Sequence, residues 1–150
     1  TIEEIIRANP DSIVIIDEAY IDFGGESCIP LIPKYDNLLV TGTFSKSRSL
    51  AGARLGFAIG NAELIADLEL MKYSTNPYNL DSLALRMGAA ALTDASKAYY
   101  KEKVGEVIKV REDTAEKLIA LGAEVLPSKA NFLYGYSGPG EICLHLRRVL

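Results

Sequence analysis

The apolar run from Ile13 to Ile16 constrains the fold of this chain more than any other feature of its sequence. The run follows Ser12 and ends at a carboxylate, Asp17. A short continuous apolar run of this kind is typical of a strand that is buried on both faces of a parallel sheet. A second segment, Leu38 to Thr43, also begins with apolar residues. We therefore predict an α/β fold in which these two segments form successive parallel strands.

Polar side chains follow both predicted strands at the point where each strand ends. Asp17 closes the first strand, whereas Thr43, Ser45 and Lys46 lie at and just beyond the end of the second. Arg54 follows a few positions later. Ligands of open α/β sheets bind beyond the carboxyl ends of the strands, and hydroxyl, ammonium and guanidinium groups together suit a phosphate ester. The sequence therefore predicts a site for a phosphate-bearing ligand, with Lys46 as its central residue.

Each of these motifs has a simpler interpretation when it is taken alone. The Ser-Lys-Ser-Arg run at residues 45–48 is typical of a solvated loop, and Asp17 and Glu18 are typical of an exposed strand end. Two such motifs on successive strands of one sheet are much more specific than either motif by itself. The combination therefore favours a ligand site.

The remaining segments are predicted from caps and hydrophobic periodicity. Thr1 and Glu4 have the spacing of a capping box, so a short helix is expected to begin there and to end at Asn9-Pro10. Further predicted elements are a buried strand at 54–60, helices at 61–76 and 81–94, and a long helix that follows Asp94 and stops at Gly122. Strands are predicted at 123–126 and 131–136, a turn at 138–140 and a helix at 141–150. The change from alternating strands and helices to one long helix predicts a domain boundary near Asp94.

The composition excludes several classes of function. The chain has 150 residues, of which 49% are hydrophobic and 24% charged, and its net charge is −4, as in ordinary soluble globular proteins. This acidic balance gives no reason to expect nucleic acid, and no apolar run approaches the length of a membrane span. Two widely spaced cysteines, Cys28 and Cys143, cannot build an ordinary zinc site with the single His145, so we predict no metal. The lack of a phosphate-binding loop motif argues against a nucleotide hydrolase.

Several motifs together resemble one enzyme family. The matching segments are Asp17–Tyr20, Thr43–Lys46, Leu50–Phe57, Lys72–Asn79 and Ser128–Phe132, so the resemblance covers nearly the whole chain in order. They resemble the signature of fold-type I, pyridoxal-phosphate-dependent aminotransferases of class I/II, and most of all the members that act on histidinol phosphate. The resemblance implies that residues 1–94 form the C-terminal half of a large cofactor-binding domain with a mixed, mostly parallel sheet. Residues 95–150 would then form an incomplete small α+β domain.

The resemblance also implies roles for individual residues. Lys46 would be the catalytic residue, because it would hold pyridoxal 5′-phosphate at rest and then carry the proton between the substrate and the cofactor. Asp17 would pair with the pyridine nitrogen, and Tyr20 would donate a hydrogen bond to the phenolic oxygen of the ring. The cofactor phosphate would be held by Thr43, Ser45 and Arg54. The implied reaction is transamination between histidinol phosphate and 2-oxoglutarate in histidine biosynthesis, by a cytoplasmic homodimer that acts on small molecules.

The same comparison suggests that the chain is an internal fragment of the enzyme. In the family an Asn-Pro-Thr-Gly turn and a glycine-rich phosphate segment would precede Thr1, and the arginines that bind the substrate carboxylate would follow Leu150. The chain alone is therefore expected to be inactive. Three alternatives stay open: a threonine-phosphate decarboxylase on the same scaffold, another fold-type I aminotransferase, and a noncatalytic domain that binds a partner through its long helix.

Overall fold

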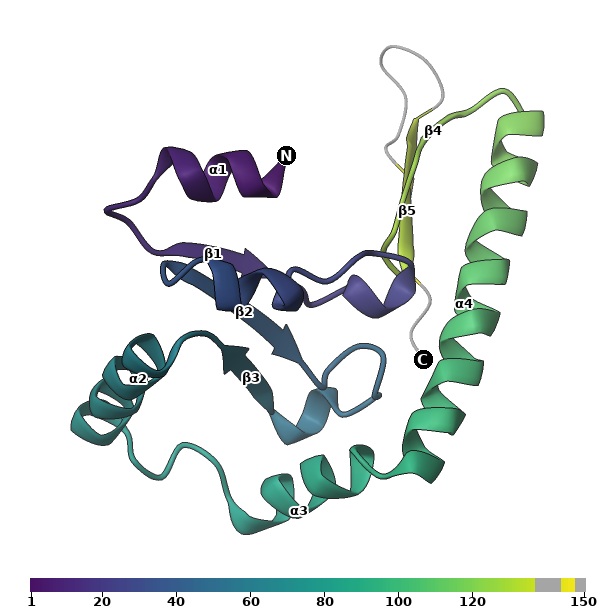
Figure 1. Cartoon of the computed structure of the whole chain (residues 1–150). Helices are drawn as coiled ribbons and strands as arrows, with labels where there is room; N and C mark the ends of the chain where they lie inside the picture. The colour runs from purple at the N-terminus through teal and green to yellow at the C-terminus, as the bar shows by residue number, and fades with distance from the viewer. Residues whose placement is uncertain (137–143, 148–150) are drawn as a thin grey trace. The chain divides into compact units, whose positions relative to one another are not determined.

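The chain divides into two compact units in the computed structural model, which describes residues 1–136 and 144–147. The first unit contains residues 1–19 and 26–91, and the second contains residues 20–25 together with the described residues from 92 onward. Figure 1 shows the elements of both units in chain order. The assignment of residues 1–94 and 95–150 to two domains of a larger enzyme stays a prediction.

A mixed three-stranded sheet forms the centre of the first unit, with the strand order β1-β2-β3. β1 (Val14–Asp17) pairs in parallel with β2 (Leu38–Thr43), and β3 (Gly56–Ile59) pairs antiparallel with β2. Both predicted strands are present and parallel, so the α/β prediction is confirmed. The third strand is also present, and it runs antiparallel to β2.

The core of this unit lies on one face of the sheet. Helix α1 (Ile2–Ala8) and the 3₁₀ helix η2 (Ile29–Lys34) pack on this face. The packed side chains come from both helices and from the two parallel strands: Ile6, Val14, Ile16, Leu31, Ile32, Leu38 and Val40. Their removal from water supplies the main stabilisation of the unit, since burial of apolar surface is the dominant favourable term in folding.

The predicted burial of β1 on both faces is wrong. Ile13 and Ile15 are 55% and 60% exposed. Successive side chains of a strand point to opposite faces, and α1 and η2 pack on the face that carries Val14 and Ile16. β3 is exposed at its first three residues, so its predicted burial is also wrong.

The helices of the first unit begin at capping side chains. Thr1 and Glu4 form the predicted capping box of α1. α2 (Ala62–Thr75) and α3 (Ser82–Ala91) follow Asn61 and Asp81, and each of these side chains accepts a hydrogen bond from the backbone N–H three residues later, at 2.8 Å and 2.7 Å. Such a cap satisfies a donor that has no partner within the helix. The predicted starts of the helices are therefore confirmed.

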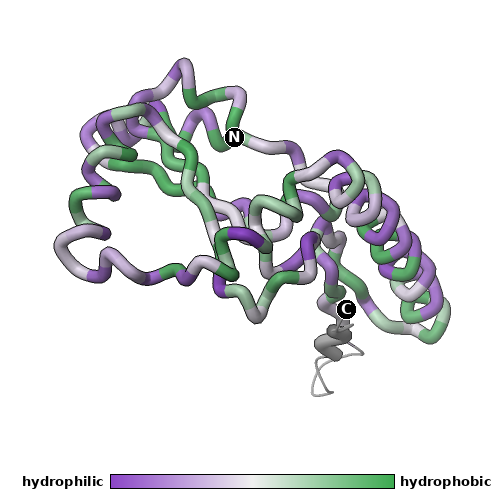
Figure 2. Tube along the Cα trace, turned by 90° about the horizontal axis from the view of Figure 1, so that it is seen from below, coloured by the Kyte–Doolittle hydropathy of each residue, from purple (hydrophilic) through white to green (hydrophobic). Residues whose placement is uncertain are grey.

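The second unit is built around the long helix α4 (Asp94–Ala120), which begins after Thr93. Val104 and Val107, each 7% exposed, pack against Phe23 of the 3₁₀ helix η1 (Ile21–Phe23). Figure 2 shows hydrophobic and hydrophilic residues alternating along α4, as expected of a helix with one packed side. No helix within the described residues combines the length and the hydrophobicity that a membrane span requires.

A second sheet, entirely antiparallel, follows α4 and has the strand order β4-β5-β6. β4 (Glu124–Leu126) and β5 (Phe132–Tyr136) lie where strands are predicted. β6 (Leu144–Arg147) falls where a helix is predicted, so that prediction is wrong. The backbone of β6 pairs along β5, and periodicity alone cannot distinguish a short strand from a short helical segment. The turn predicted at 138–140 lies outside the described residues.

A polar cluster connects α1 to η2 and should make stability depend on pH. The Lys34 ammonium and the Tyr35 hydroxyl donate to Glu3 Oε1 at 2.8 Å and 2.7 Å. These hydrogen bonds hold the pKa of the Glu3 carboxyl at about 2, well below its usual value of 4.5. Because the folded pKa lies below the unfolded one, the stabilisation is complete above the unfolded pKa and is lost as the pH falls toward 2.

We predict that Lys34→Met raises the pKa of Glu3 and reduces the acid-dependent loss of stability between pH 4.5 and 2. The removed ammonium is the largest cause of the lowered pKa, so the carboxylate should protonate at a higher pH in the variant. An NMR titration of the Glu3 side chain measures this pKa. Lys117→Met, at an exposed position of α4, is the matched control. An unchanged Glu3 pKa in Lys34→Met would contradict the assignment.

Candidate active site

The carboxyl ends of β1 and β2 meet at one edge of the sheet in the first unit. Asp17 is the last residue of β1 and lies beside Thr41 in the parallel register. Thr43 is the last residue of β2 and lies beside Gly56, the first residue of the antiparallel strand β3. The loop that connects β2 to β3 therefore begins and ends at this edge.

This edge brings together most of the residues that the sequence predicts for the site. Ser45 and Lys46 lie two and three residues after the end of β2, and Arg54 lies two residues before the start of β3. The predicted residues that the sheet gathers here are Asp17, Thr43, Ser45, Lys46 and Arg54. A carboxylate, two hydroxyls, an ammonium and a guanidinium are thus located where open α/β sheets bind ligands.

Hydrogen bonds within the loop between β2 and β3 fix its shape. The Phe44 N–H donates to the Leu55 carbonyl at 3.0 Å, and the Leu50 N–H donates to the Phe44 carbonyl at 2.9 Å. The Thr43 hydroxyl accepts from the Ser45 N–H at 3.0 Å and donates to the Leu55 carbonyl at 3.4 Å. The side chain of Thr43 therefore fixes the position of the Ser45 backbone.

Arg54 combines an unusual backbone conformation with an exposed guanidinium. Its φ is 52°, and Ser49 in the same loop has a φ of 54°. Left-handed conformations of non-glycine residues cost about 1–3 kcal/mol and cluster at ligand sites. Within the described residues, the guanidinium donates to the Ala51 carbonyl at 3.0 Å and to no other group. Because a guanidinium has five N–H donors, Arg54 retains most of its capacity to bind an anion.

Arg54 also lines a cavity of about 280 Å³ in the first unit. The other walls are formed by Gly52 and Ala53, by residues 79–81 and by the first turns of α3. Gly88 of α3 permits a close approach, since a Cβ at this position would lie 2.3 Å from Cδ2 of the buried Leu55. The exposed guanidinium therefore borders a concave surface and not a flat one.

The other charged residues of the loop differ in their surroundings. Lys46 is half-buried. Arg48 is also half-buried: its guanidinium carbon lies 5.3 Å from the centre of the Phe44 ring, and Nη1 donates to the Ser47 hydroxyl at 3.1 Å. Ser47 is only 5% exposed. The interpretation of residues 45–48 as a fully solvated loop is therefore wrong.

Asp17 and Glu18 are adjacent, but their environments are opposite. Asp17 is exposed and accepts a hydrogen bond from the Ala19 N–H at 3.0 Å. Glu18 is 8% exposed and accepts from the Ser27 hydroxyl at 2.8 Å and from the Cys28 N–H. Burial, together with the Glu18 charge, raises the pKa of the Cys28 thiol. Glu18 therefore joins β1 to the segment before η2, whereas Asp17 stays accessible to a ligand.

Tyr20, the remaining predicted residue, belongs to the second unit. Its ring packs edge-to-face on Phe132, with ring centres 5.3 Å apart and planes at 87°. Aromatic pairs in this geometry are stabilising beyond the area that they bury. Tyr20 is thus a packed residue of the second unit, and its role toward a cofactor stays a prediction.

Sequence reasoning missed three buried polar residues. Glu18, Ser47 and Arg111 are 8%, 5% and 9% exposed. For Arg111 the sequence contains a signal, because it lies seven positions after Val104 on the apolar stripe of α4 and a charge on such a stripe needs partners. For Glu18 the signal is the alternation of side chains along a strand, which places it on the face opposite Asp17. Ser47, which lies in a loop, has no comparable signal.

Comparison with known proteins identifies the family. The family model described as aminotransferase class I and II matches residues 1–150. The chain belongs to this family. It is 56% identical over 133 residues to the histidinol-phosphate aminotransferase of Lactococcus lactis subsp. cremoris strain SK11, a match that covers 89% of the chain and 37% of the relative. The chain therefore spans little more than a third of the length of this relative.

Solved structures agree with the fold of this aminotransferase-family chain. The histidinol-phosphate aminotransferase of Sinorhizobium meliloti in complex with pyridoxal-5′-phosphate superposes with a TM-score of 0.75 at 24% identity and covers 91% of the chain and 38% of that protein. The L-threonine-O-3-phosphate decarboxylase of Porphyromonas gingivalis gives a TM-score of 0.74 at 22% identity, covering 93% and 42%. The predicted fold class is confirmed, and the fold alone does not distinguish the two reactions.

The contrast between Asp17 and Glu18 gives a test on stability. Glu18→Ala leaves the buried Cys28 N–H without its acceptor, so the free energy of unfolding should fall by about 1–3 kcal/mol. Asp17→Asn, at the neighbouring exposed position, is the matched control and should change stability by less than about 0.5 kcal/mol. Urea unfolding followed by circular dichroism measures both values. Equal losses in the two variants would show that Glu18 has no special structural role.

Proposed function

We propose that this chain is part of a pyridoxal-phosphate-dependent aminotransferase that transfers an amino group between histidinol phosphate and 2-oxoglutarate in histidine biosynthesis. The observation that carries the proposal is the sheet edge that gathers Asp17, Thr43, Ser45, Lys46 and Arg54. The relative that is 56% identical and bears the name of this enzyme supports the choice of substrate. The activity belongs to the full-length protein, because the chain covers 37% of that relative.

The side chains at the edge suit the chemical groups of the cofactor. Bound pyridoxal phosphate supplies an electron sink for the negative charge that develops at the substrate α-carbon. Ser45 offers a hydroxyl for the phosphate, and Thr43 would add a second one by turning its hydroxyl away from the Leu55 carbonyl. The exposed guanidinium of Arg54 can donate two parallel charge-assisted hydrogen bonds to the phosphate. The donor set therefore fits a phosphate ester.

Asp17 and Lys46 have different tasks in this proposal. The Asp17 carboxylate would accept a hydrogen bond from the pyridine nitrogen and keep that nitrogen protonated, which would favour the flow of charge into the ring. Its exposure is consistent with this task, whereas the buried Glu18 is already occupied by Ser27 and Cys28. Lys46 would hold the cofactor at rest and would then serve as the general base and acid for the proton at the substrate α-carbon.

By the family resemblance, Tyr20 would donate a hydrogen bond to the phenolic oxygen of the cofactor ring and favour its ionised form. Its fixed ring position against Phe132 supports a positioning role. We further propose that the full-length enzyme is a cytoplasmic homodimer that acts on small amino and 2-oxo compounds. These assignments follow the family resemblance of the motif from Asp17 to Tyr20.

The role of Lys46 can be tested by covalent trapping. Borohydride reduction of the full-length holoenzyme should fix the cofactor on Lys46, because only an amine bonded to the cofactor aldehyde carbon becomes irreversibly attached. Peptide mapping by mass spectrometry locates the adduct. Lys34 and Lys72, on η2 and α2, serve as internal controls that should stay unmodified. An adduct on either of them would contradict the assignment.

The reaction can be tested with both candidate substrates. Full-length enzyme incubated with histidinol phosphate and 2-oxoglutarate should form glutamate. Asp17→Asn should lower the rate of glutamate formation on the order of a hundredfold while the cofactor stays bound. Glutamate formation and cofactor absorbance are measured in parallel. Release of carbon dioxide from threonine phosphate without glutamate would favour the decarboxylase. A colourless protein with neither reaction would favour the noncatalytic alternative.

A further inference from the structure

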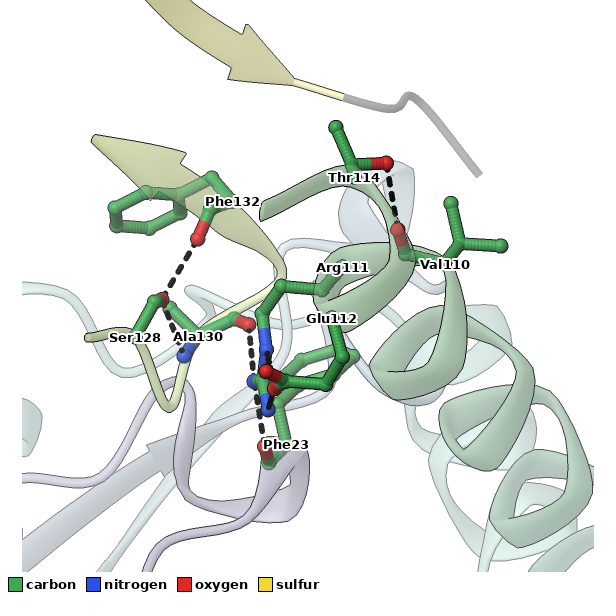
Figure 3. A network of polar contacts seen from close by, with 8 residues as sticks. All are labelled: Phe23, Val110, Arg111, Glu112, Thr114, Ser128, Ala130 and Phe132. Carbon is green, nitrogen blue, oxygen red and sulfur yellow. Dashed lines mark hydrogen bonds and ion pairs between the residues drawn. The ribbon is translucent and has the colours of Figure 1, made fainter. Parts of the chain in front are cut away.

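The buried Arg111 of α4 joins segments of the second unit that are far apart in the sequence. Its side chain is 8% exposed. Nη1 donates to the Phe23 carbonyl at 2.9 Å and to the Ala130 carbonyl at 2.8 Å. Figure 3 shows these two hydrogen bonds converging on one guanidinium nitrogen. A single side chain thus satisfies backbone groups that lie 88 and 19 positions away from it in the chain.

The guanidinium is held in place by a neighbouring carboxylate. Nε and Nη2 of Arg111 donate to Oε1 of Glu112 at 2.8 Å and 2.6 Å. Glu112 is 57% exposed, so the ion pair connects the buried guanidinium to the surface of the unit. With Nε and Nη2 bound to Glu112, the planar group presents Nη1 to the two carbonyls in a fixed direction.

The first carbonyl belongs to the segment that carries Tyr20. Phe23 is fully buried against α4. Its N–H donates to the Tyr20 carbonyl at 3.1 Å, and the Gly25 N–H donates to the Ile21 carbonyl at 2.9 Å. Residues 20–25 therefore form one compact turn. Because Arg111 holds the Phe23 carbonyl within this turn, it also restricts the backbone of Tyr20.

The second carbonyl belongs to the turn that carries the aromatic partner of Tyr20. The Ser128 hydroxyl donates to the Phe132 carbonyl at 2.7 Å and accepts from the Ala130 N–H at 3.1 Å. The turn is thus closed by Ser128 and bound to α4 through the Ala130 carbonyl. Both halves of the contact between Tyr20 and Phe132 are consequently connected to Arg111.

We propose that Arg111 is a positioning residue for Tyr20, which it fixes through the Phe23 carbonyl on one side and through the Ala130 turn and Phe132 on the other. Arg111 would act by fixing the ring of Tyr20, whose hydroxyl the proposed function assigns to the phenolic oxygen of the cofactor. This inference rests on the proposed function, because it concerns the hydrogen bond that Tyr20 gives to the cofactor. A lysine has no fixed fork of donors and can reproduce the arrangement only in part.

The experiment uses the full-length holoenzyme with Arg111→Met, Arg111→Lys and Tyr20→Phe. Lys109→Met, at an exposed position of the same helix, is the matched control. Hydrogen exchange followed by mass spectrometry reports the two segments directly. In Arg111→Met, exchange in residues 20–25 and 128–132 should become roughly tenfold faster or more, because the buried Phe23 carbonyl and the partly buried Ala130 carbonyl lose their donor. Exchange in α1 should stay unchanged in every variant.

The second measurement is the pH titration of the cofactor absorption band in the resting enzyme. Arg111→Met should shift the midpoint in the same direction as Tyr20→Phe, and the double variant should shift it no further than Tyr20→Phe alone. Arg111→Lys should restore part of the wild-type midpoint, and Lys109→Met should leave it unchanged. Should Arg111→Met not fold, Arg111→Lys and Glu112→Gln give the test, with smaller shifts in the same direction.

The outcomes separate this inference from the proposed function. A wild-type midpoint in all Arg111 and Glu112 variants, with a shifted midpoint in Tyr20→Phe, would overturn the positioning role and leave the function intact. Additive shifts in the double variant would also overturn it, since the two residues would then act independently. A wild-type enzyme without a cofactor band would overturn both.

Discussion

The parallel pairing of β1 with β2 is the interaction on which the first unit depends. It sets Asp17 beside Thr41, and the Glu18 N–H extends it by donating to the Thr41 carbonyl at 2.8 Å. A slip of one residue would exchange the two faces of the strand, so that Asp17 would turn toward the core and Glu18 away from Ser27. The register therefore determines at once which carboxylate is buried and which is available to a ligand.

Much of this arrangement was predictable from the sequence, because the deciding signals are local. The apolar runs before Asp17 and Thr43, the caps Thr1 and Asn61 and the stop before Pro77 each act within a few residues. Their predicted elements are present in the structure. The convergence of Asp17, Thr43 and Lys46 on one edge then follows from the rule that parallel strands end on the same side of a sheet.

The predictions that are wrong depend on contacts between segments distant in the sequence. The exposure of Ile15 depends on which face α1 and η2 cover, and the strand at Leu144–Arg147 depends on pairing with β5. Glu18 and Arg111 are buried because Cys28, Phe23 and Ala130 provide partners from elsewhere in the chain. Such partners cannot be derived from the residue types next to either position.

The charged residues of the chain divide by whether the fold already uses their hydrogen-bonding capacity. A buried charge is tolerated only when it is paired, and Glu18 and Arg111 are each satisfied by groups of the chain itself. Asp17 and Arg54 are exposed, and among the residues that the structure describes the side chain of each forms one hydrogen bond, with the Ala19 N–H and the Ala51 carbonyl. Their remaining capacity faces solvent at an edge shaped by two left-handed residues and a bordering cavity. The residues suited to bind a ligand are thus the ones that the fold holds in position without saturating them.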